Sequence, residues 1–297
     1  VCYLCCFPSV KRVHVIDIKK NCRLLLNHKV TDVTKSAEKG RWLVTYRHED
    51  QTQHEAFDFL INAAGFKTGR LDDMLGFKRE RLVEFKAAYV SRWDDCSAVW
   101  PEVIFFGERG TPKGMAQFTP YPGGYFQLHG MTKSITLFEE GLVKSSPHSA
   151  QPQLGRKFLD KIDKEWKPSE AKTRTELAIN HVAHYIPAFE KASVVSKPLY
   201  GAQQIPGRDA SLRAADVSFV DDHYARCEIV KASSVLSMAD AITKQLIALG
   251  YVDERVYGKR DFSTMEELDD MEIGKYAESL CRDRNYPVSL TQRTVGN

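Results

Sequence analysis

The first quarter of the chain alternates apolar and polar residues, which is typical of β-strands because successive side chains on a strand point to opposite faces. This pattern predicts strands over residues 23–33, 42–48 and 55–62. The polar stretches between them, residues 36–40 and 49–51, are short enough to be tight turns. Three strands joined by two tight connections predict an antiparallel meander.

The middle of the chain predicts a larger sheet that is followed by helices. Strand character recurs over residues 82–93, 103–107, 115–121 and 125–130, and Pro122-Gly123-Gly124 predicts a turn between the last two. Apolar residues at helical spacing predict helices over residues 69–75, 153–166, 169–184 and 235–249, with a short one in the tail. Between the helices the chain returns to β-structure over residues 193–204 and 216–231. Together these elements predict a mixed α/β fold with a long antiparallel sheet.

The predicted strand at residues 55–62 ends in three residues that have almost no side chain, Ala63, Ala64 and Gly65. Small residues at the end of a buried strand let a ligand or another backbone approach closely. In an open α/β sheet, ligands bind at the carboxyl ends of the strands. A tight turn that needs a positive φ at Gly65 explains the same residues, and by spacing alone it is the simpler interpretation.

A second segment of interest, Lys231-Ala232-Ser233-Ser234, connects a predicted strand to the helix at residues 235–249. A helix N-terminus has unpaired N–H groups and partial positive charge, which suit an anion or an electron-rich ring edge. Ser234 or Ser237 is expected to cap this helix, and Ser237 with Asp240 fits the Ser-x-x-Asp capping box. Capping alone is the alternative explanation of the segment.

Aromatic and polar residues alternate along the hairpin at residues 117–130. One face of this hairpin is expected to line a pocket, with Tyr121, Tyr125, Gln127 or His129 pointing inward. An amphipathic hairpin with one solvated face is the alternative.

Composition excludes several classes of protein. The 297 residues are 43% hydrophobic and 27% charged, and 42 basic against 39 acidic residues give a net charge of +3. The basic residues are scattered along the chain, so no nucleic-acid partner is expected. No apolar run reaches the roughly 18 residues of a transmembrane helix. The seven cysteines are irregularly spaced, so reduced thiols and a cytoplasmic location are expected.

Motifs for several common chemistries are missing. None of the 18 glycines forms a G-x-G, and no G-K-[S/T], H-E-x-x-H or G-x-S-x-G occurs. A metal could be held by Cys2, Cys5 and Cys6 with His14, or by His181 with His184. Neither group has a complete set of ligands at a known spacing, so no metal is expected.

Taken in chain order, these elements resemble the FAD-dependent oxidoreductases of the D-amino-acid oxidase, glycine oxidase and sarcosine oxidase type. In that family a meander leads to a strand that ends in N-A-A-G, as Asn62-Ala63-Ala64-Gly65 does here. A strand–turn–helix then returns late in the chain, where Lys231-Ala232-Ser233-Ser234 stands. The resemblance covers roughly residues 10–250, and the order of its elements is more specific than any single motif.

The resemblance implies a division into domains. Residues 1–68 and 200–250 would form a discontinuous FAD-binding domain, residues 69–199 a substrate domain built on the large antiparallel sheet, and residues 251–297 a C-terminal tail. The family's first element is a βαβ unit with G-x-G-x-x-G, which is missing here, so the FAD-binding domain is expected to be incomplete. The chain also has no initiator methionine and is expected to be part of a longer gene product.

The resemblance also implies a cofactor and a reaction, namely FAD and hydride transfer from a C–H bond of an amine, amino acid or 2-hydroxy acid to flavin N5. Val30 fits the place of a valine near the adenine, and the other implied cofactor contacts are Ala63, Ala64, Gly65, Lys231, Ala232, Ser233 and Ser234. An arginine commonly binds the substrate carboxylate, because its fork matches two oxygens.

The candidate arginines are Arg92, Arg109, Arg213 and Arg226, and Arg226 is preferred because it precedes the flavin-side turn. Tyr121, Tyr125 and His129 are candidates to orient or deprotonate the substrate. The alternative is a binding or scaffold protein of the same fold that has lost the cofactor, since the glycine-rich loop is missing. The sequence leaves the substrate, the electron acceptor and the oligomeric state open.

Overall fold

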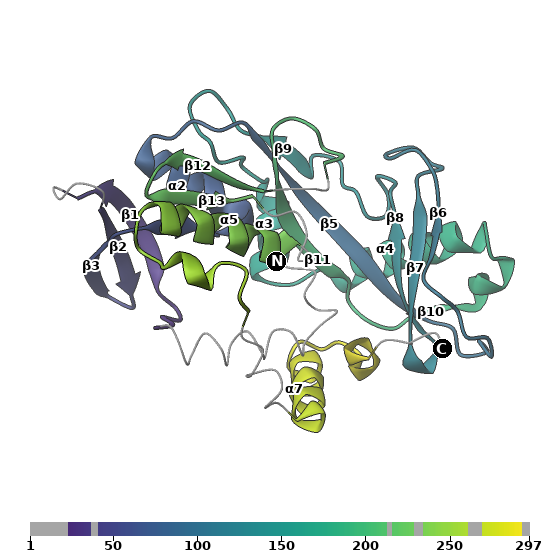
Figure 1. Ribbon diagram of the computed structural model, residues 1–297. Helices are drawn as coiled ribbons and strands as arrows, with labels where there is room; N and C mark the ends of the chain where they lie inside the picture. The colour runs from purple at the N-terminus through teal and green to yellow at the C-terminus, as the bar shows by residue number, and fades with distance from the viewer. Residues whose placement is uncertain (1–22, 37–40, 213–215, 229–233, 261–268, 293–297) are drawn as a thin grey trace.

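Three β-sheets organise the part of the chain that the computed structural model describes, namely residues 23–36, 41–212, 216–228, 234–260 and 269–292 (Figure 1). The fold is mixed α/β, as the sequence predicts. In Figure 1 a meander lies at the left, a small mixed sheet lies beside it, and a large antiparallel sheet extends to the right.

The predicted meander is present. Its strands β1 (Lys29–Lys35), β2 (Trp42–His48) and β3 (Gln51–Phe57) pair in sequence order and antiparallel. The inward side chains of the meander include Val33 and Trp42, which are buried against the neighbouring small sheet.

Two boundaries of the meander differ from the prediction. The first strand begins at Lys29 rather than at residue 23. The third strand does not reach residue 62, because β3 ends at Phe57 and the next strand, β4 (Leu60–Asn62), joins a different sheet. The partner of β4 is β13 (Tyr224–Cys227), which lies far along the chain and has no signature in the local pattern.

The small mixed sheet has the order β12-β13-β4. Strand β12 (Val217–Asp221) forms a hairpin with β13, and both strands lie within the β-structure predicted over residues 216–231. Helix α5 (Val235–Ala248) packs on this sheet through Met238 and Ile242.

The large sheet is built around β5 (Arg81–Arg92), whose pairings are all antiparallel, as predicted. Its described strands besides β5 are β6 (Val103–Phe105), β7 (Ala116–Tyr121), β8 (Tyr125–Gly130), β9 (Leu142–Lys144), β10 (Ser193–Val194) and β11 (Leu199–Pro206).

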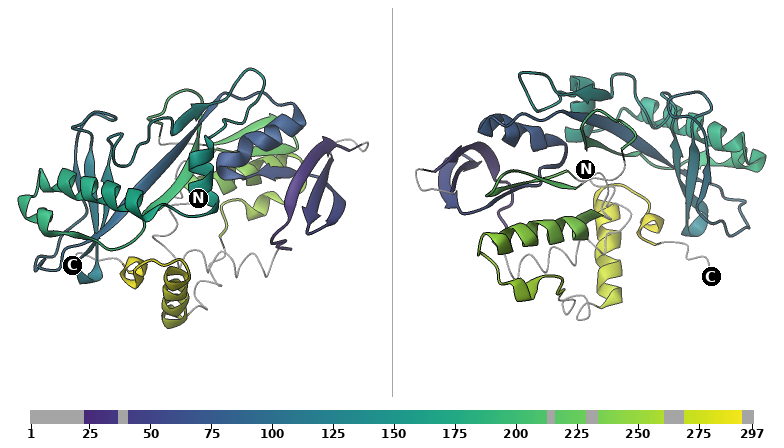
Figure 2. Two further views of the ribbon diagram at one scale, coloured as in Figure 1. Left: turned by 180° about the vertical axis from the view of Figure 1, so that it is seen from behind. Right: turned by 45° about the horizontal axis from the view of Figure 1, so that its top comes forward.

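The two faces of the large sheet differ. On one face Phe85, Tyr89 and Phe118 form the main core with α3 (Arg156–Asp163) and α4 (Pro168–Ala183), and Figure 2 shows α4 lying across this face. Helix α4 confirms the prediction at residues 169–184, whereas α3 is shorter at both ends than the helix predicted at residues 153–166. On the opposite face Ala88, Val90 and Leu199 pack against the C-terminal helix α7 (Asp270–Asp283) and the short turn of helix that follows it.

The remaining described helices are short. They are α2 (Thr68–Leu75), which is close to the predicted helix at residues 69–75, and the 3₁₀ turns η2 (Gly65–Lys67), η3 (Pro122–Gly124), η4 (Pro187–Lys191), η6 (Glu254–Val256) and η7 (Val288–Thr291). Within the described ranges, no helix has both the length and the apolar character needed to cross a membrane.

Candidate functional site

The Asn62-Ala63-Ala64-Gly65 turn lies at the carboxyl end of β4, at an edge that β4 shares with β13. The two strands are parallel, with Ile61 opposite Ala225 and Asn62 opposite Arg226. The residues that follow β4 and those that follow β13 therefore leave the sheet at the same edge. The segment from β13 to α5 contains Lys231, Ala232 and Ser233, which lie outside the described residues. Both predicted cofactor segments therefore follow strands that end at the same edge, where ligands of open α/β sheets bind.

The buried side chain of Asn62 holds the turn in shape. Its Nδ2 donates to the carbonyl oxygen of Thr68 at 2.9 Å and to the hydroxyl of Tyr224 at 2.7 Å. Its Oδ1 accepts from the N–H of Ala64 at 3.3 Å, which closes an Asx-type turn. An aspartate in this place would have no N–H to donate, so the amide explains the first residue of the motif.

The small side chains of the turn have two different explanations, one for Gly65 and one for Ala63 and Ala64. Gly65 has a φ of +59°, and a Cβ added to it would meet no atom within 4 Å. The positive φ, rather than a close approach within the chain, therefore accounts for the glycine. Ala63 and Ala64 are exposed, and their methyl groups are the only side-chain atoms that they present at the strand end.

The first turn of α5 has no side-chain cap. Ser234 is its N-cap residue but makes no capping hydrogen bond. In a capping box, the hydroxyl of Ser237 and the carboxylate of Asp240 would both accept from backbone N–H groups. Instead, Ser237 donates to the carbonyl of Ser234 at 3.2 Å and Asp240 accepts from Arg260 at 2.7 Å, so the predicted capping box is wrong.

Val30 lies on β1 with 37% of its surface exposed, and its contact with adenine stays a prediction.

A buried ion cluster, consisting of Asp72, Arg79, Arg81, Arg226 and Glu228, adjoins the turn. Asp72 on α2 accepts hydrogen bonds from Arg226 at 2.8 to 2.9 Å and from Arg81. Glu228 accepts two bonds from Arg79, at 2.6 and 2.9 Å, and lies 4.0 Å from Arg81. Asp72, Arg81 and Arg226 expose at most 2% of their surface. Buried charges are tolerated only when they are paired, so this cluster depends on every partner.

Tyr224 links the ion cluster to the turn. Its hydroxyl receives the bond from Asn62 and donates to Asp72 at 3.0 Å. Burial, together with the negative charge of Asp72, raises the pKa of Tyr224 above its ordinary value of 10, so the phenol stays protonated and keeps donating. The shape of the turn is thus coupled to the charges beneath it.

Arg226, the arginine that the sequence favours for substrate binding, is engaged in this cluster. Its Nε and Nη2 donate to Asp72, and its Nη1 donates to the hydroxyl of Ser218 at 3.0 Å. A buried guanidinium with these bonds is placed to hold α2 against β13. The structure does not bring Arg226 together with the other three predicted catalytic residues, which lie on the large sheet.

Those three residues share one face of the large sheet, called the polar face below. The register places Tyr121 opposite Tyr125, and Gln127 and His129 follow on the same side of β8. The alternate residues of both strands, Phe118, Phe126 and Leu128, point into the main core instead. Tyr121, Tyr125, Gln127 and His129 therefore share one side of the hairpin, while their predicted place in the wall of a pocket stays a prediction.

Hydrogen bonds connect the residues of the polar face. The hydroxyl of Tyr121 donates to Oε1 of Gln127 at 3.2 Å, and Nε2 of Gln127 lies 2.8 Å from Nε2 of His129. With the amide in this orientation, His129 accepts at Nε2 and carries its proton on Nδ1. Burial, together with the positive charge of Lys86, lowers the pKa of His129 from 6.5 to about 4, so the imidazole is neutral at pH 7.

A charged group continues the polar face along β5. Glu84 and Lys86 are both buried, and Nζ of Lys86 lies 2.9 Å from Oε2 of Glu84. Arg109, on the loop between β6 and β7, donates to the other oxygen of Glu84. The Nη1 of Arg109 is buried and has no hydrogen-bond partner within the described part of the chain.

Glu84 and Lys86 were not predicted from the sequence, although it contains a signal for them. In the run LVEFKAAYV they are the only charged residues, and they stand two positions apart in an otherwise apolar strand. Two charges on the same side of a buried strand require partners, which marks that side as a polar site.

Of the candidate metal ligands, His181 and His184 lie in the described part of the chain. Nε2 of His181 lies 2.8 Å from the carbonyl oxygen of Gly114. The described residues contain no group of three or more His, Cys, Asp or Glu side chains placed to hold a metal. Cys2, Cys5, Cys6 and His14 lie outside the described residues, as does the candidate Arg213.

Neither a family model nor a curated protein matches the chain. Solved structures with a partial likeness include a flavoprotein/dehydrogenase from Cytophaga hutchinsonii (12% identity, TM-score 0.44) and glycine oxidase from Geobacillus kaustophilus (14% identity, TM-score 0.44). The first match covers 94% of this chain and 60% of that one, and the second covers 82% and 52%. The chain thus spans somewhat more than half the length of these proteins. With TM-scores this low, the likenesses establish neither family nor activity.

The low pKa of His129 predicts a stability that depends on pH. Between pH 6.5 and about 4 the unfolded chain protonates this histidine while the folded protein does not, so acid favours unfolding. The free energy of unfolding should fall as pH decreases through this window, by up to about 3 kcal/mol from this residue. Denaturant titrations at several pH values should show that His129→Gln flattens the slope, while His148→Gln, at an exposed position, leaves it unchanged. An equal slope in all three proteins would contradict the assignment.

Proposed function

We propose that this chain is part of a flavin-dependent oxidoreductase that binds FAD and oxidises an amine, an amino acid or a 2-hydroxy acid. The main support is the parallel pairing of β4 with β13. This pairing brings the ends of the two strands that precede the predicted cofactor segments to one edge of a sheet. A ligand at that edge would meet the Ala63-Ala64-Gly65 turn on one side and the segment before α5 on the other.

The residues present fit one wall of a flavin site. Ala63 and Ala64 are small and exposed, so a flat ring can lie against their backbone. The first turn of α5, which begins after Ser234, offers N–H groups that the side chain of Ser234 does not cap. When bound, the flavin would supply a hydride acceptor at N5. The sequence contains no G-x-G, so the phosphate-binding loop of the family is not among these residues.

We place the substrate on the polar face of the large sheet. Arg109 replaces Arg226 as the preferred carboxylate-binding residue, because its Nη1 makes no hydrogen bond to the described residues while Arg226 is engaged with Asp72. A guanidinium fork suits two carboxylate oxygens. His129, which is neutral at pH 7 and carries its proton on Nδ1, would orient the substrate amine or hydroxyl by donating a hydrogen bond to it, and Tyr121 would hold the ring through Gln127.

A measurement of FAD binding tests the proposed function. The gene product in its longest translated form, purified with added FAD, should show the visible absorbance bands of a bound flavin, and these should bleach when a substrate is added without oxygen. Ala64→Leu should weaken FAD binding by about tenfold or more, because the added side chain occupies the surface that the ring needs. Ala188→Leu, at an exposed position on η4, is the matched control and should bind FAD as the unchanged protein does.

A cofactor-free binding or scaffold protein is the second candidate function. The absence of G-x-G favours it, as does the Lys-Ala-Ser-Ser segment in place of a glycine-rich turn. This alternative predicts no flavin bands in any form of the protein and no effect of Ala64→Leu. That result would overturn the oxidoreductase proposal.

A further inference from the structure

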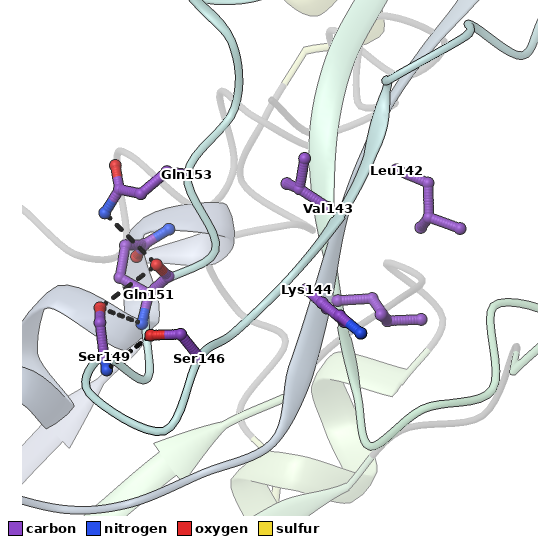
Figure 3. A pocket seen from close by; sticks show the side chains of 8 residues that line it. Leu142, Val143, Lys144, Ser146, Ser149, Gln151 and Gln153 are labelled. Carbon is purple, nitrogen blue, oxygen red and sulfur yellow. Dashed lines mark hydrogen bonds between the residues drawn. The ribbon is translucent and has the colours of Figure 1, made fainter.

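Two adjoining hollows lie between β9, the loop at residues 145–153 and the start of β5. Their volumes are about 920 Å³ and about 600 Å³, and both are lined by Leu82, Lys144 and Ser146. Together they are called the β9 groove. Figure 3 shows the smaller hollow, with β9 on one side and, on the other, a hydrogen-bonded row of polar side chains, Ser146, Ser149, Gln151 and Gln153. Hollows of this size hold small organic molecules.

The larger hollow is lined by five basic side chains and a single acidic one, Glu80. Three of the basic side chains are neutralised by carboxylates. Arg79 pairs with Glu228, Arg81 with Asp72 and Arg208 with Glu80. The other two, Lys78 and Lys144, form no ion pair with any residue in the described ranges. Lys78 and Lys144 therefore give the lining of the larger hollow an excess of positive charge.

The hydroxyl groups of Ser145 and Ser146 are further hydrogen-bond donors that line the groove. The oxygen of Ser146 accepts from the N–H groups of His148 at 3.3 Å and Ser149 at 3.1 Å, and the oxygen of Ser145 accepts from the N–H of Arg81 at 3.1 Å. Because both oxygens act as acceptors, each hydroxyl keeps its hydrogen for another partner. Neither hydroxyl donates to a residue that the structure describes.

The loop that forms one wall is held in place before any ligand binds. Nζ of Lys78 donates to the carbonyl oxygen of Pro147 at 2.9 Å. Asp73 on α2 accepts from the hydroxyl of Ser149 and from the N–H of Ala150, each at 2.6 Å. A wall that is fixed in advance reduces the entropy lost on binding.

From this excess of charge, these donors and this fixed wall, we propose that the β9 groove binds the anionic group, a carboxylate or a phosphate, of a small organic molecule. Lys144 and Lys78 supply the positive charge, and Ser145 and Ser146 supply hydrogen bonds. The apolar surface of Leu82 would contact the body of the ligand. The residues that line the groove include none of those proposed to contact the flavin or the substrate, so this inference does not depend on the proposed function.

Calorimetric titrations at constant ionic strength test the proposal, with inorganic phosphate in one series and succinate in the other. At least one of the two should bind saturably, and the series that does so identifies the anionic group. Lys144→Gln should weaken that binding by about tenfold, because it removes a charge-assisted hydrogen bond. Lys144→Arg, which keeps the charge, should retain most of the affinity.

The matched control is Lys172→Gln, which removes an exposed lysine from α4 and should leave the affinity within about twofold. Lys144 is exposed on the edge strand β9, so its replacement should not prevent folding, and a circular dichroism spectrum checks this. The proposal is overturned if neither anion binds saturably, or if Lys144→Gln binds as tightly as the unchanged protein.

Discussion

Replacing Asp72 with asparagine should lower the free energy of unfolding by about 3 to 5 kcal/mol. Asparagine keeps the shape of the side chain but removes the charge that both Arg81 and Arg226 require. Both guanidinium groups are almost completely buried, so water cannot replace the lost carboxylate. Chemical denaturation followed by fluorescence measures the change, and its midpoint should shift to a lower denaturant concentration.

Two further variants separate this effect from a general loss of charge. Glu80→Gln removes a carboxylate from an exposed ion pair with Arg208 and should change stability by less than about 1 kcal/mol. The double variant Asp72→Asn with Arg226→Met should be less destabilised than Asp72→Asn alone, because it leaves one fewer uncompensated charge. If Asp72→Asn and Glu80→Gln had similar effects, the cluster would have no special role in stability.

Gly69→Ala should destabilise the protein by about 3 kcal/mol, although alanine ordinarily favours a helix. Gly69 lies in α2, and a Cβ on it would fall 2.4 Å from the carbonyl oxygen of Ala150 and 2.6 Å from Cα of Gln151. Both of these atoms belong to backbone, so the loop at residues 145–153 would have to move away from the helix. Thermal or chemical unfolding of the purified variant measures the change.

The same substitution in another helix is the matched control. Gly274 lies in α7, and a Cβ on it would meet no atom within 4 Å. Gly274→Ala should therefore be neutral or stabilise the protein by up to about 1 kcal/mol. Equal effects at the two positions would show that α2 and the loop at residues 145–153 are not in close contact.

The spacing of apolar and polar residues within single segments was sufficient to predict most helices and strands of this fold. The sequence predicted the helices α3, α4 and α5, the hairpin of β7 and β8, and the long strand β5, because each depends on a period of two or of 3.6 residues within one segment. It also predicted that Tyr121, Tyr125 and His129 share a face, since alternate residues of a strand point to the same side.

Pairing between distant segments was not visible in the pattern. Residues 55–62 look like one strand, but the last three pair with β13, and only that pairing shows which edge the Ala63-Ala64-Gly65 turn occupies. The assignment of Arg226 depended on its position in the chain, whereas the structure places its guanidinium on Asp72.

What the sequence alone determined about this protein is therefore the type and order of its elements and the polar side of its hairpin. The tertiary structure decided which charges meet, because ion pairs such as Asp72 with Arg226 join residues more than 150 positions apart. It also decided which charges form no ion pair within the described part of the chain, as at Lys144. Periodicity reports only which side of an element is buried, and the partner of a buried charge depends on how the elements pack.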